Sequence, residues 1–376
     1  MKAKEKKMEI KIEKQELQRQ LQLVQGIAER KTTMPILSNV LITAKDKKIS
    51  LTGTDLEVAV ICECKADVLE EGNVTVQAKG LFDIVKELSE DVVHIKTNEK
   101  HWLEISCGKS EFKLVGLSGD EYPALPTKGE GVSFSLPSSV ITEMFSKTSF
   151  SMSNDEARYN LNGVLLETEE ENGKNILRMV STDGHRLSIV DRDLEGVKLK
   201  RPVILPRKGV SELKRLLETQ HETFSFWIDP KYAIAHCGDV TLIIRLIDGQ
   251  FPPYRQVLPK KAGKILNVDR KEIYHALKRV SAMSSDRSKG VKFHIAPKVT
   301  ELSTSNPDFG QAKEDVEVEY HGQSFDIGFN GRYFLDALSS LKDETCSLEF
   351  GDDTSPCVFR SEFDTGYVHV IMPMRL

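Results

Sequence analysis

The chain has 376 residues and a formal net charge of −5, with 39% hydrophobic and 29% charged residues. This balance excludes a disordered chain, and the length predicts two to three domains. Residues 1–7 are mostly charged and lack the apolar stretch of a signal peptide, and no apolar run is long enough to span a bilayer. We therefore expect a soluble, cytoplasmic protein without a membrane partner.

A pattern of one helix, short strands, a second helix and further strands occurs three times. In chain order, the first repeat has helix Lys14–Lys31, strand opening Asn39–Leu41, turn Thr54–Asp55, helix Gln77–Glu90 and closing dipeptide Tyr122–Pro123. The second has Ser139–Phe150, Gly163–Leu165, Thr182–Asp183, Leu205–Glu218 and Phe251–Pro252. The third has Asp269–Val280, Gly290–Lys292, Ser305–Asn306, Phe329–Lys342 and Met372–Pro373. Similar units in one chain indicate a ring or an array.

Each repeat is about one domain long and can bury its own core. We predict an α+β fold with three repeated domains at residues 1–129, 130–259 and 260–376. The six cysteines contain no C-x-x-C pair, which in a cytosolic protein favours reduced, structural thiols.

The predicted helices are more basic than the chain as a whole, with 17 basic and 11 acidic residues. A solvated helix face explains such a count, but so does a face that meets a polyanion. At about 100° per residue, the basic side chains of Leu205–Glu218 lie opposite its apolar side. Moreover Lys79, Lys208 and Arg332 occupy the same position in the three repeats. This arrangement favours contacts with the phosphates of duplex DNA that do not read the base sequence.

The most enzyme-like stretch is Ser181–Arg186, with an alcohol, Asp183 and His185. A hydrolase that uses Asp183 and His185 is one alternative, but neighbours in sequence do not make a triad, and Asp183–Gly184 also reads as a tight turn. No phosphate-binding loop, dinucleotide-binding or metalloprotease motif is present. We interpret Glu167–Glu171 as a solvated hairpin end, and we expect no catalytic residue, metal or cofactor.

The final segment, Val368–Leu376, is apolar and rich in methionine. A last core strand explains it. Methionines beside a surface groove are the other interpretation, because they provide adaptable contacts for different peptides.

Several motifs together resemble those of the bacterial β sliding clamp, the processivity subunit of DNA polymerase III, from Met8 to Leu376. They are Thr33–Leu37, Leu51–Leu56, Arg158–Gly163, Thr182–Leu187, Leu205–Gly209, Phe251–Arg255 and Met372–Leu376. The resemblance implies two three-domain subunits joined head to tail in a ring lined by twelve helices. It implies a non-catalytic subunit of a DNA-directed DNA polymerase (nucleotidyltransferase) holoenzyme that encircles double-stranded DNA in replication. A DNA-free scaffold built from the same repeats is a further alternative.

The resemblance also assigns residues. DNA-facing residues are Lys31, Lys79, Arg207 and Lys208, and helix geometry adds Lys278, Arg279 and Arg332. A cleft between the second and third domains would bind short peptide motifs of the clamp loader, the polymerase III catalytic subunit, other polymerases and repair proteins. Its walls are Arg158, Leu161, Thr182, His185, Leu187, Pro252, Val257, Val370, Met372, Pro373 and Met374. The homodimer interface would join Phe112 and Leu114 to Ala282 and Met283.

Two departures from the family are visible. Residues 1–7 precede the family start, so Met8 is a candidate initiator. Asn160 stands where the family often has a second tyrosine, which puts an aromatic contact to DNA there in doubt.

Overall fold

The computed structural model describes residues 7–28, 34–171, 173–194, 196–218, 222–258, 263–284, 289–352 and 354–375. The chain forms two compact units, Met1–Ser138 with Ser211–Leu246, and Ser139–Val210 with Ile247–Leu376. The predicted boundaries 1–129, 130–259 and 260–376 stay a proposal.

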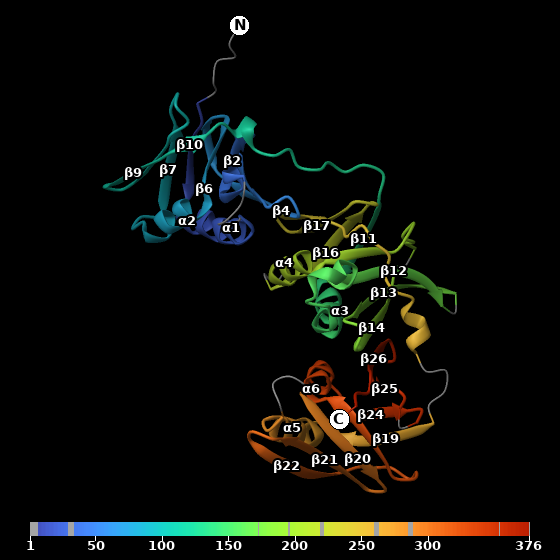
Figure 1. The fold of residues 1–376 in the computed structure, drawn as a ribbon. Helices are drawn as coiled ribbons and strands as arrows, with labels where there is room; N and C mark the ends of the chain where they lie inside the picture. The colour runs from blue at the N-terminus through green and yellow to red at the C-terminus, as the bar shows by residue number, and fades with distance from the viewer. Residues whose placement is uncertain are drawn as a thin grey trace. The chain divides into compact units, whose positions relative to one another are not determined.

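The same order of elements recurs three times along the chain, with β5 and β10 as additional strands of the first repeat (Figure 1). The first repeat contains β1 (Glu9–Glu13), α1 (Lys14–Ile27), β2 (Asn39–Lys45), β3 (Lys48–Thr54), β4 (Val58–Lys65), β5 (Asp67–Glu70), β6 (Gly72–Gln77), α2 (Ala78–Glu87), β7 (Val92–Thr97), β8 (Leu103–Cys107), β9 (Ser110–Leu114) and β10 (Gly116–Leu117). The second contains β11 (Val132–Pro137), α3 (Ser138–Thr148), β12 (Gly163–Glu171), β13 (Lys174–Thr182), β14 (Arg186–Asp193), β15 (Val203–Pro206), α4 (Arg207–Leu217), β16 (Thr223–Ile228), β17 (Tyr232–Cys237) and β18 (Val240–Arg245). The third contains β19 (Lys264–Asp269), α5 (Arg270–Ser281), β20 (Gly290–Ala296), β21 (Val299–Asn306), β22 (Gly310–Glu317), β23 (Phe325–Asn330), α6 (Gly331–Ser340), β24 (Thr345–Phe350), β25 (Cys357–Arg360) and β26 (Tyr367–Ile371). Short 3₁₀ turns are η1 (Pro35–Ser38), η2 (Gly119–Glu121), η3 (Ser149–Ser151), η4 (Glu156–Leu161) and η5 (Tyr254–Val257).

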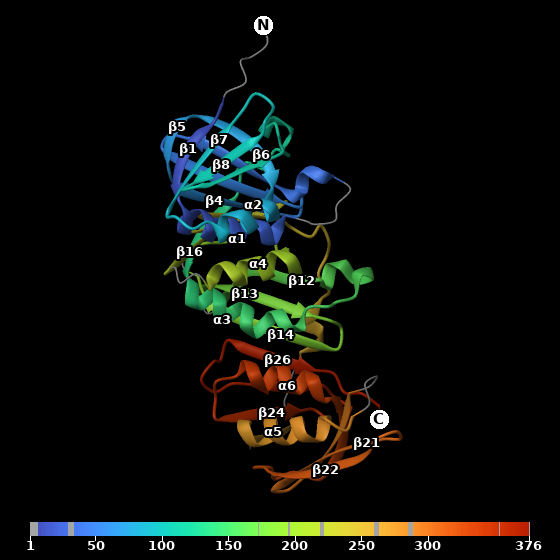
Figure 2. The same cartoon turned by 90° about the vertical axis from the view of Figure 1, so that its left-hand side faces the viewer.

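The first unit holds two antiparallel sheets. One has the strand order β5-β1-β7-β8-β9 and the other β10-β6-β2-β3-β4-β18-β17-β16-β11. In the larger sheet β4 of the first repeat pairs with β18 of the second, from Val240 opposite Cys62 to Ile244 opposite Val58. Helices α1 and α2 lie side by side (Figure 2).

The second unit repeats this plan with the orders β15-β12-β13-β14-β26-β25-β24-β19 and β22-β21-β20-β23. Here β14 of the second repeat pairs with β26 of the third, from Arg186 opposite Ile371 to Val190 opposite Tyr367. Helices α5 and α6 lie side by side (Figure 2). The two joints, β4·β18 and β14·β26, therefore use equivalent strands.

All six predicted helices are present, with shorter limits in most cases. Leu205 and Phe329 belong to strands β15 and β23, and their helices begin afterwards. The N-terminus of α6 is set by Asn330, whose side chain accepts a hydrogen bond from the Arg332 amide. An asparagine or aspartate that caps a helix in this way satisfies a backbone donor that has no partner within the helix.

The three predicted turns are also confirmed. Asp55 accepts hydrogen bonds from the amides of Glu57 and Val58 between β3 and β4. Asp183 and Asn306 accept equivalent bonds after β13 and β21. Aspartate and asparagine favour such turns because their short side chains reach the backbone two residues further on.

Candidate functional site

The second unit contains an apolar groove of about 310 Å³. Its volume is at the lower end of the range for sites that bind small ligands or peptide side chains. The walls are Leu161, Thr182, Gly184, Arg186, Leu187, Pro252, Pro253, Tyr254, Gln256, Val257, Val370 and Met372. These residues come from η4, the β13–β14 turn, the segment around η5, and the end of β26.

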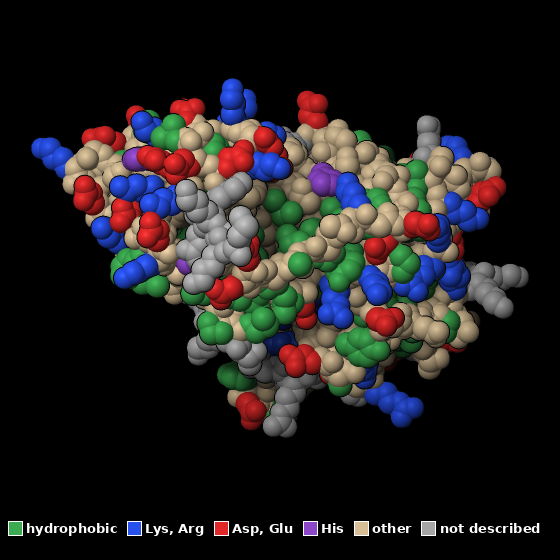
Figure 3. All heavy atoms as spheres, turned by 90° about the horizontal axis from the view of Figure 1, so that it is seen from above, with side chains coloured by type: hydrophobic (Ala, Val, Ile, Leu, Met, Phe, Trp, Pro, Cys, Tyr) green, Lys and Arg blue, Asp and Glu red, His purple; other side chains and the backbone are tan. Residues whose placement is uncertain are grey.

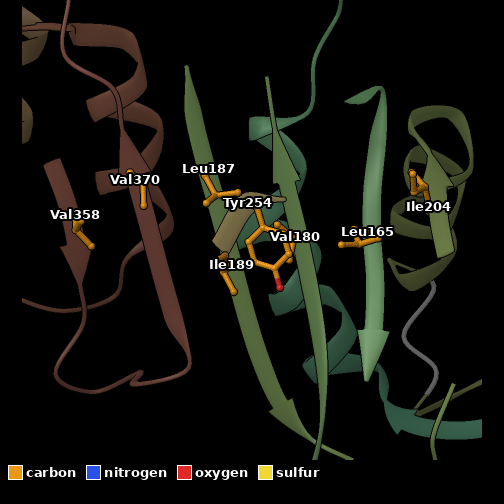
Figure 4. Packing of buried hydrophobic residues seen from close by; sticks show 8 residues of the cluster. All are labelled: Leu165, Val180, Leu187, Ile189, Ile204, Tyr254, Val358 and Val370. Carbon is orange, nitrogen blue, oxygen red and sulfur yellow. The ribbon is translucent and has the colours of Figure 1, made fainter. Parts of the chain in front are cut away.

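The floor of the groove continues into a hydrophobic core cluster. Figure 4 shows Tyr254 beside Leu187, Ile189 and Val180, with Val370 on the neighbouring strand. Because β14 and β26 come from different repeats, the groove lies where the second and third repeats join. The buried branched side chains of this cluster lie beneath the groove, and their close packing makes its floor rigid.

The turn between β13 and β14 holds one wall in place. The Thr182 hydroxyl donates to the Arg186 carbonyl at 2.6 Å and accepts from the Gly184 amide at 3.0 Å. Gly184 has a φ of +88°, a conformation that a side chain would strain. The residues Thr182–Gly184 are therefore explained by turn geometry.

The same turn accounts for the enzyme-like stretch. Asp183 caps the turn and its second oxygen accepts from Arg186 Nε at 3.0 Å. Ser181 is fully buried and donates to the Thr148 carbonyl, whereas His185 is exposed. The alcohol, carboxylate and imidazole thus do not converge on one reacting atom, as a nucleophile and its base must.

Arg186 connects this turn to the third repeat. Its guanidinium donates to Asp336 of α6 at 2.6 Å and to the Phe150 carbonyl, and it lies 4.3 Å from the centre of the Tyr333 ring. The side chain is nearly buried, so these charge-assisted contacts are not screened by water. The wall it lines is fixed from both repeats.

The C-terminal segment forms the opposite wall. The amides of Met372 and Met374 donate to the carbonyls of His185 and Gly328, each at 2.8 Å. His369, three residues earlier, is fully buried, and burial with the nearby Arg186 charge lowers its pKa to about 3. The core-strand interpretation is confirmed for β26, and Met372 lines the groove, whereas its contact with peptides stays a prediction.

Seven of the eleven predicted cleft residues line this groove: Leu161, Thr182, Leu187, Pro252, Val257, Val370 and Met372. Arg158, His185, Pro373 and Met374 are adjacent but not among the lining residues. The prediction missed Gly184, Arg186, Pro253, Tyr254 and Gln256, although all of them except Gln256 belong to a motif that it quoted. Their peptide-binding role remains a prediction.

Three of the predicted basic residues repeat at one helix position. Lys79, Lys208 and Arg332 are each the second residue of their helices, α2, α4 and α6, as the repeat arithmetic predicts. Lys278 is exposed near the end of α5. Figure 3 shows acidic and basic side chains interspersed on the face that it draws.

At least three predicted DNA contacts have protein partners: the Lys79 ammonium pairs with Asp83 one turn further along α2, and Arg207 and Arg279 have partners too. Arg207 donates to the carbonyls of Met152 and Ser153 at 2.9 and 2.8 Å, and burial lowers its pKa. Arg279 forms a paired contact with Glu314 of β22, with Nε at 2.9 Å from the carboxylate. Lys31 lies outside the described residues.

The interpretation of Glu167–Glu171 as a solvated hairpin end is wrong for its first half. The hairpin does turn between Glu171 and Lys174, but Glu167 is 7% exposed and accepts hydrogen bonds from Tyr254 and Arg255. A run of glutamates on a strand alternates between faces, so part of it points inward.

Of the predicted interface residues, Phe112 and Leu114 lie on β9, and Ala282 and Met283 follow α5. Met283 lies beside Gly310, the first residue of β22. In the part of the chain that the structure describes, no three His, Cys, Asp or Glu side chains gather as metal ligands, and no helix is long and apolar enough to cross a membrane. All six cysteines are free and buried.

Family models match nearly the whole chain. The N-terminal, central and C-terminal domains of the DNA polymerase III beta subunit match residues 8–126, 135–253 and 255–375. The beta sliding clamp of Haemophilus influenzae is 37% identical over 370 residues, which cover 98% of this chain and 100% of that protein. The beta sliding clamp of Escherichia coli is 34% identical with the same coverage.

Solved structures agree with these matches. The beta sliding clamp of Caulobacter crescentus has a TM-score of 0.95 at 35% identity, covering 98% of this chain and 100% of that one. The sliding clamp of Bartonella birtlesii bound to griselimycin has a TM-score of 0.94 at 32% identity with the same coverage.

Proposed function

This chain belongs to the DNA polymerase III β subunit family, and on that premise we propose that it is a DNA sliding clamp. Two copies form a ring around duplex DNA and tether the replicative polymerase. The observation that carries the proposal is the threefold repeat with two equivalent joints, β4·β18 and β14·β26, because the strands equivalent to a third joint, β9 and β22, each end a sheet among the described strands and can pair with another copy.

The free strands support the ring. Strands β4, β14 and β22 hold the same place in the three repeats, as do β9, β18 and β26. Among the described strands, β22 ends one sheet and β9 ends another. Pairing β22 of one copy with β9 of the next repeats the internal joints, and a head-to-tail contact closes a ring where the rotation permits.

Apolar side chains accompany both edges. Phe112 on β9 is exposed, and Phe309, at the turn into β22, is 74% exposed. Met283 lies beside the same turn. Aromatic side chains are enriched at interfaces, and these two lie at the two edges that the proposed joint would pair.

The groove of the second unit is the proposed receptor for partner peptides. It is mainly apolar, has few polar groups, and is held by hydrogen bonds on both walls. Such a site accepts apolar side chains of a short extended segment. The partners in this proposal are the clamp loader, the polymerase III catalytic subunit, other polymerases and repair proteins.

DNA contacts in this proposal are electrostatic. Lys79, Lys208 and Arg332 repeat at one position, and Lys278 adds an exposed charge. Topology rather than adhesion supplies residence time, so weak phosphate contacts suffice and permit sliding. We infer no catalytic role for the chain, and we place its activity in the cytoplasm with the replication machinery.

The groove is tested by Met372→Asp and Leu161→Asp, since a charge in an apolar pocket loses hydration without gaining a partner. We propose that griselimycin, the ligand in the Bartonella birtlesii clamp structure, binds this groove. We expect each variant to lose at least tenfold, about 1.4 kcal/mol, in affinity for griselimycin, measured by calorimetry. Phe363→Asp is the matched control, because Phe363 is exposed and does not line the groove. Unchanged affinity in both groove variants would refute the assignment.

A further inference from the structure

The glutamates of Glu167–Glu171 on β12 form an acidic cluster near the groove. None of the peptide or DNA contacts proposed above involves this cluster. Its inner member, Glu167, lies on β12 and is 7% exposed. The Tyr254 hydroxyl donates to Glu167 Oε1, and Arg255 Nη2 donates to the same oxygen at 2.8 Å. One buried carboxylate therefore holds two successive residues of η5.

A second arginine fixes the surroundings of Glu167. Arg178 on β13 makes two hydrogen bonds to Asp191 of β14, at 2.7 and 2.6 Å, and further ion pairs with Glu169 and Glu171. Burial raises the pKa of Asp191 despite this pairing. Two guanidinium groups thus link four carboxylates across three strands, and such a network, once satisfied, resists rearrangement.

Tyr254 connects the network to the groove. Its ring belongs to the core cluster and lines the groove, with the Arg255 guanidinium 4.8 Å from the ring centre. Pro253, just before Tyr254, and Gln256, two residues after it, line the groove as well. The position of this wall therefore depends on the Tyr254 hydroxyl. That hydroxyl is held by Glu167, which does not itself line the groove.

We propose that Glu167 is a positioning residue for the groove: by holding Tyr254 and Arg255 it sets the wall Pro252–Val257 that a partner peptide meets. The inference rests on the proposed function of the groove as a peptide receptor. A wall held in its binding position before the ligand arrives saves the ordering cost of binding, so loosening it weakens affinity without removing any ligand contact.

The test is a double-mutant cycle on the full chain with Glu167→Gln, Tyr254→Phe and both together, using griselimycin as the probe. Affinity and dissociation rate are measured on folded protein, and thermal midpoints are recorded in parallel. We expect each single variant to bind about tenfold more weakly, with faster dissociation. The double variant should bind no more weakly than the weaker single variant, because the hydrogen bond lost in Tyr254→Phe is one of the two that Glu167→Gln disturbs. Glu170→Gln, on the exposed face of β12 and outside the Arg178 and Arg255 ion pairs named above, should keep the parent affinity.

Unchanged affinity in both single variants would overturn the proposal, and so would effects that add in the double variant. A lower thermal midpoint with unchanged affinity would show that Glu167 only supports the fold. If Glu167→Gln does not fold, Tyr254→Phe decides, because it removes only the hydroxyl. Met372→Asp separates the receptor hypothesis from the positioning hypothesis. If Met372→Asp loses binding while Glu167→Gln binds like the parent, only the positioning role is overturned. If Met372→Asp binds like the parent, the groove is not the receptor.

Discussion

Arg207 begins α4, and its guanidinium donates to the carbonyls of Met152 and Ser153. These bonds join the helix start to the loop after η3. A basic residue that was predicted to face DNA can therefore stabilise the fold instead. The helical period alone cannot reveal this, because it gives the side of the helix on which a side chain lies and not the group that it contacts.

We predict different effects for Arg207 and for the basic residues at the second helix position. Arg207→Ala should lower the free energy of unfolding by about 2 kcal/mol, since it removes charged hydrogen bonds to two carbonyls. Urea titration measures this change. A stability equal to that of the parent would contradict the role in the fold.

Charge reversal at Lys79 and Arg332 should act on DNA instead. Each phosphate contact removed lowers the slope of log affinity against log salt by about 1, so the double variant should lose about two. Binding of the clamp to duplex DNA is measured across a salt series. Lys231→Glu, on the exposed turn between β16 and β17, is the control. An unchanged slope in the double variant would count against the helix N-termini as DNA contacts.

Lys147 is 3% exposed, and its ammonium meets Glu143 and Asp364, with Arg192 on the same carboxylates. Burial alone would raise the pKa of Asp364, but hydrogen bonds from Arg192 and Lys147 outweigh it, and the pKa is lowered. A carboxyl with a lowered folded pKa stabilises the fold above its unfolded pKa of about 3.9, and that stability is lost as pH falls through the folded pKa.

The free energy of unfolding should therefore fall as the pH drops below about 4. Asp364→Asn should be less stable at neutral pH and lose less on acidification. Urea unfolding from neutral pH to about pH 3 checks both statements. A variant with the same acid dependence as the parent would show that other groups control it.

At the scale of elements, the helices and turns were predictable because their signals are local. The apolar faces of α4 and α5, with Val210, Leu213, Ile273 and Leu277 buried, follow the predicted period. The helix starts were placed too early at Leu205 and Phe329, because apolar strand residues precede each helix. The partners of β14 and β4 could not be predicted, since pairing across more than a hundred residues leaves no local pattern.

The same limit applies to the groove. Motifs identified most of its walls, but the inward side chain of Glu167 and the contact of Arg186 with Asp336 depend on where strands from different repeats meet. A charge run in sequence does not show which of its members becomes buried.

The edge strands give a prediction of their own. Phe112→Glu on β9 should convert the dimer to a monomer, because it places a charge at the edge that we propose to pair with β22 of the next copy, where carboxylates of β22 already lie. Sedimentation measures the mass of the particle. Leu69→Glu is the matched control, since Leu69 is exposed on β5, the other edge of the same sheet. A dimer that survives Phe112→Glu would argue against this edge.

At the scale of the whole molecule, an acidic protein with a net charge of −5 is proposed to enclose a polyanion. Repulsion over most of the surface discourages binding from outside, while basic helix starts allow contact inside a ring. Retention then depends on closure of the ring and not on affinity. Salt should weaken the contacts without releasing the protein from closed DNA.

The most direct measurement of this claim compares retention on two forms of one DNA molecule. The protein is assembled by its clamp loader on nicked circular DNA, and half of the sample is linearised with a restriction enzyme before gel filtration in high salt. We predict that the protein stays with the circle and leaves the linear DNA by sliding off the ends. Equal retention on both forms, or equal loss from both, would contradict a closed ring around the duplex.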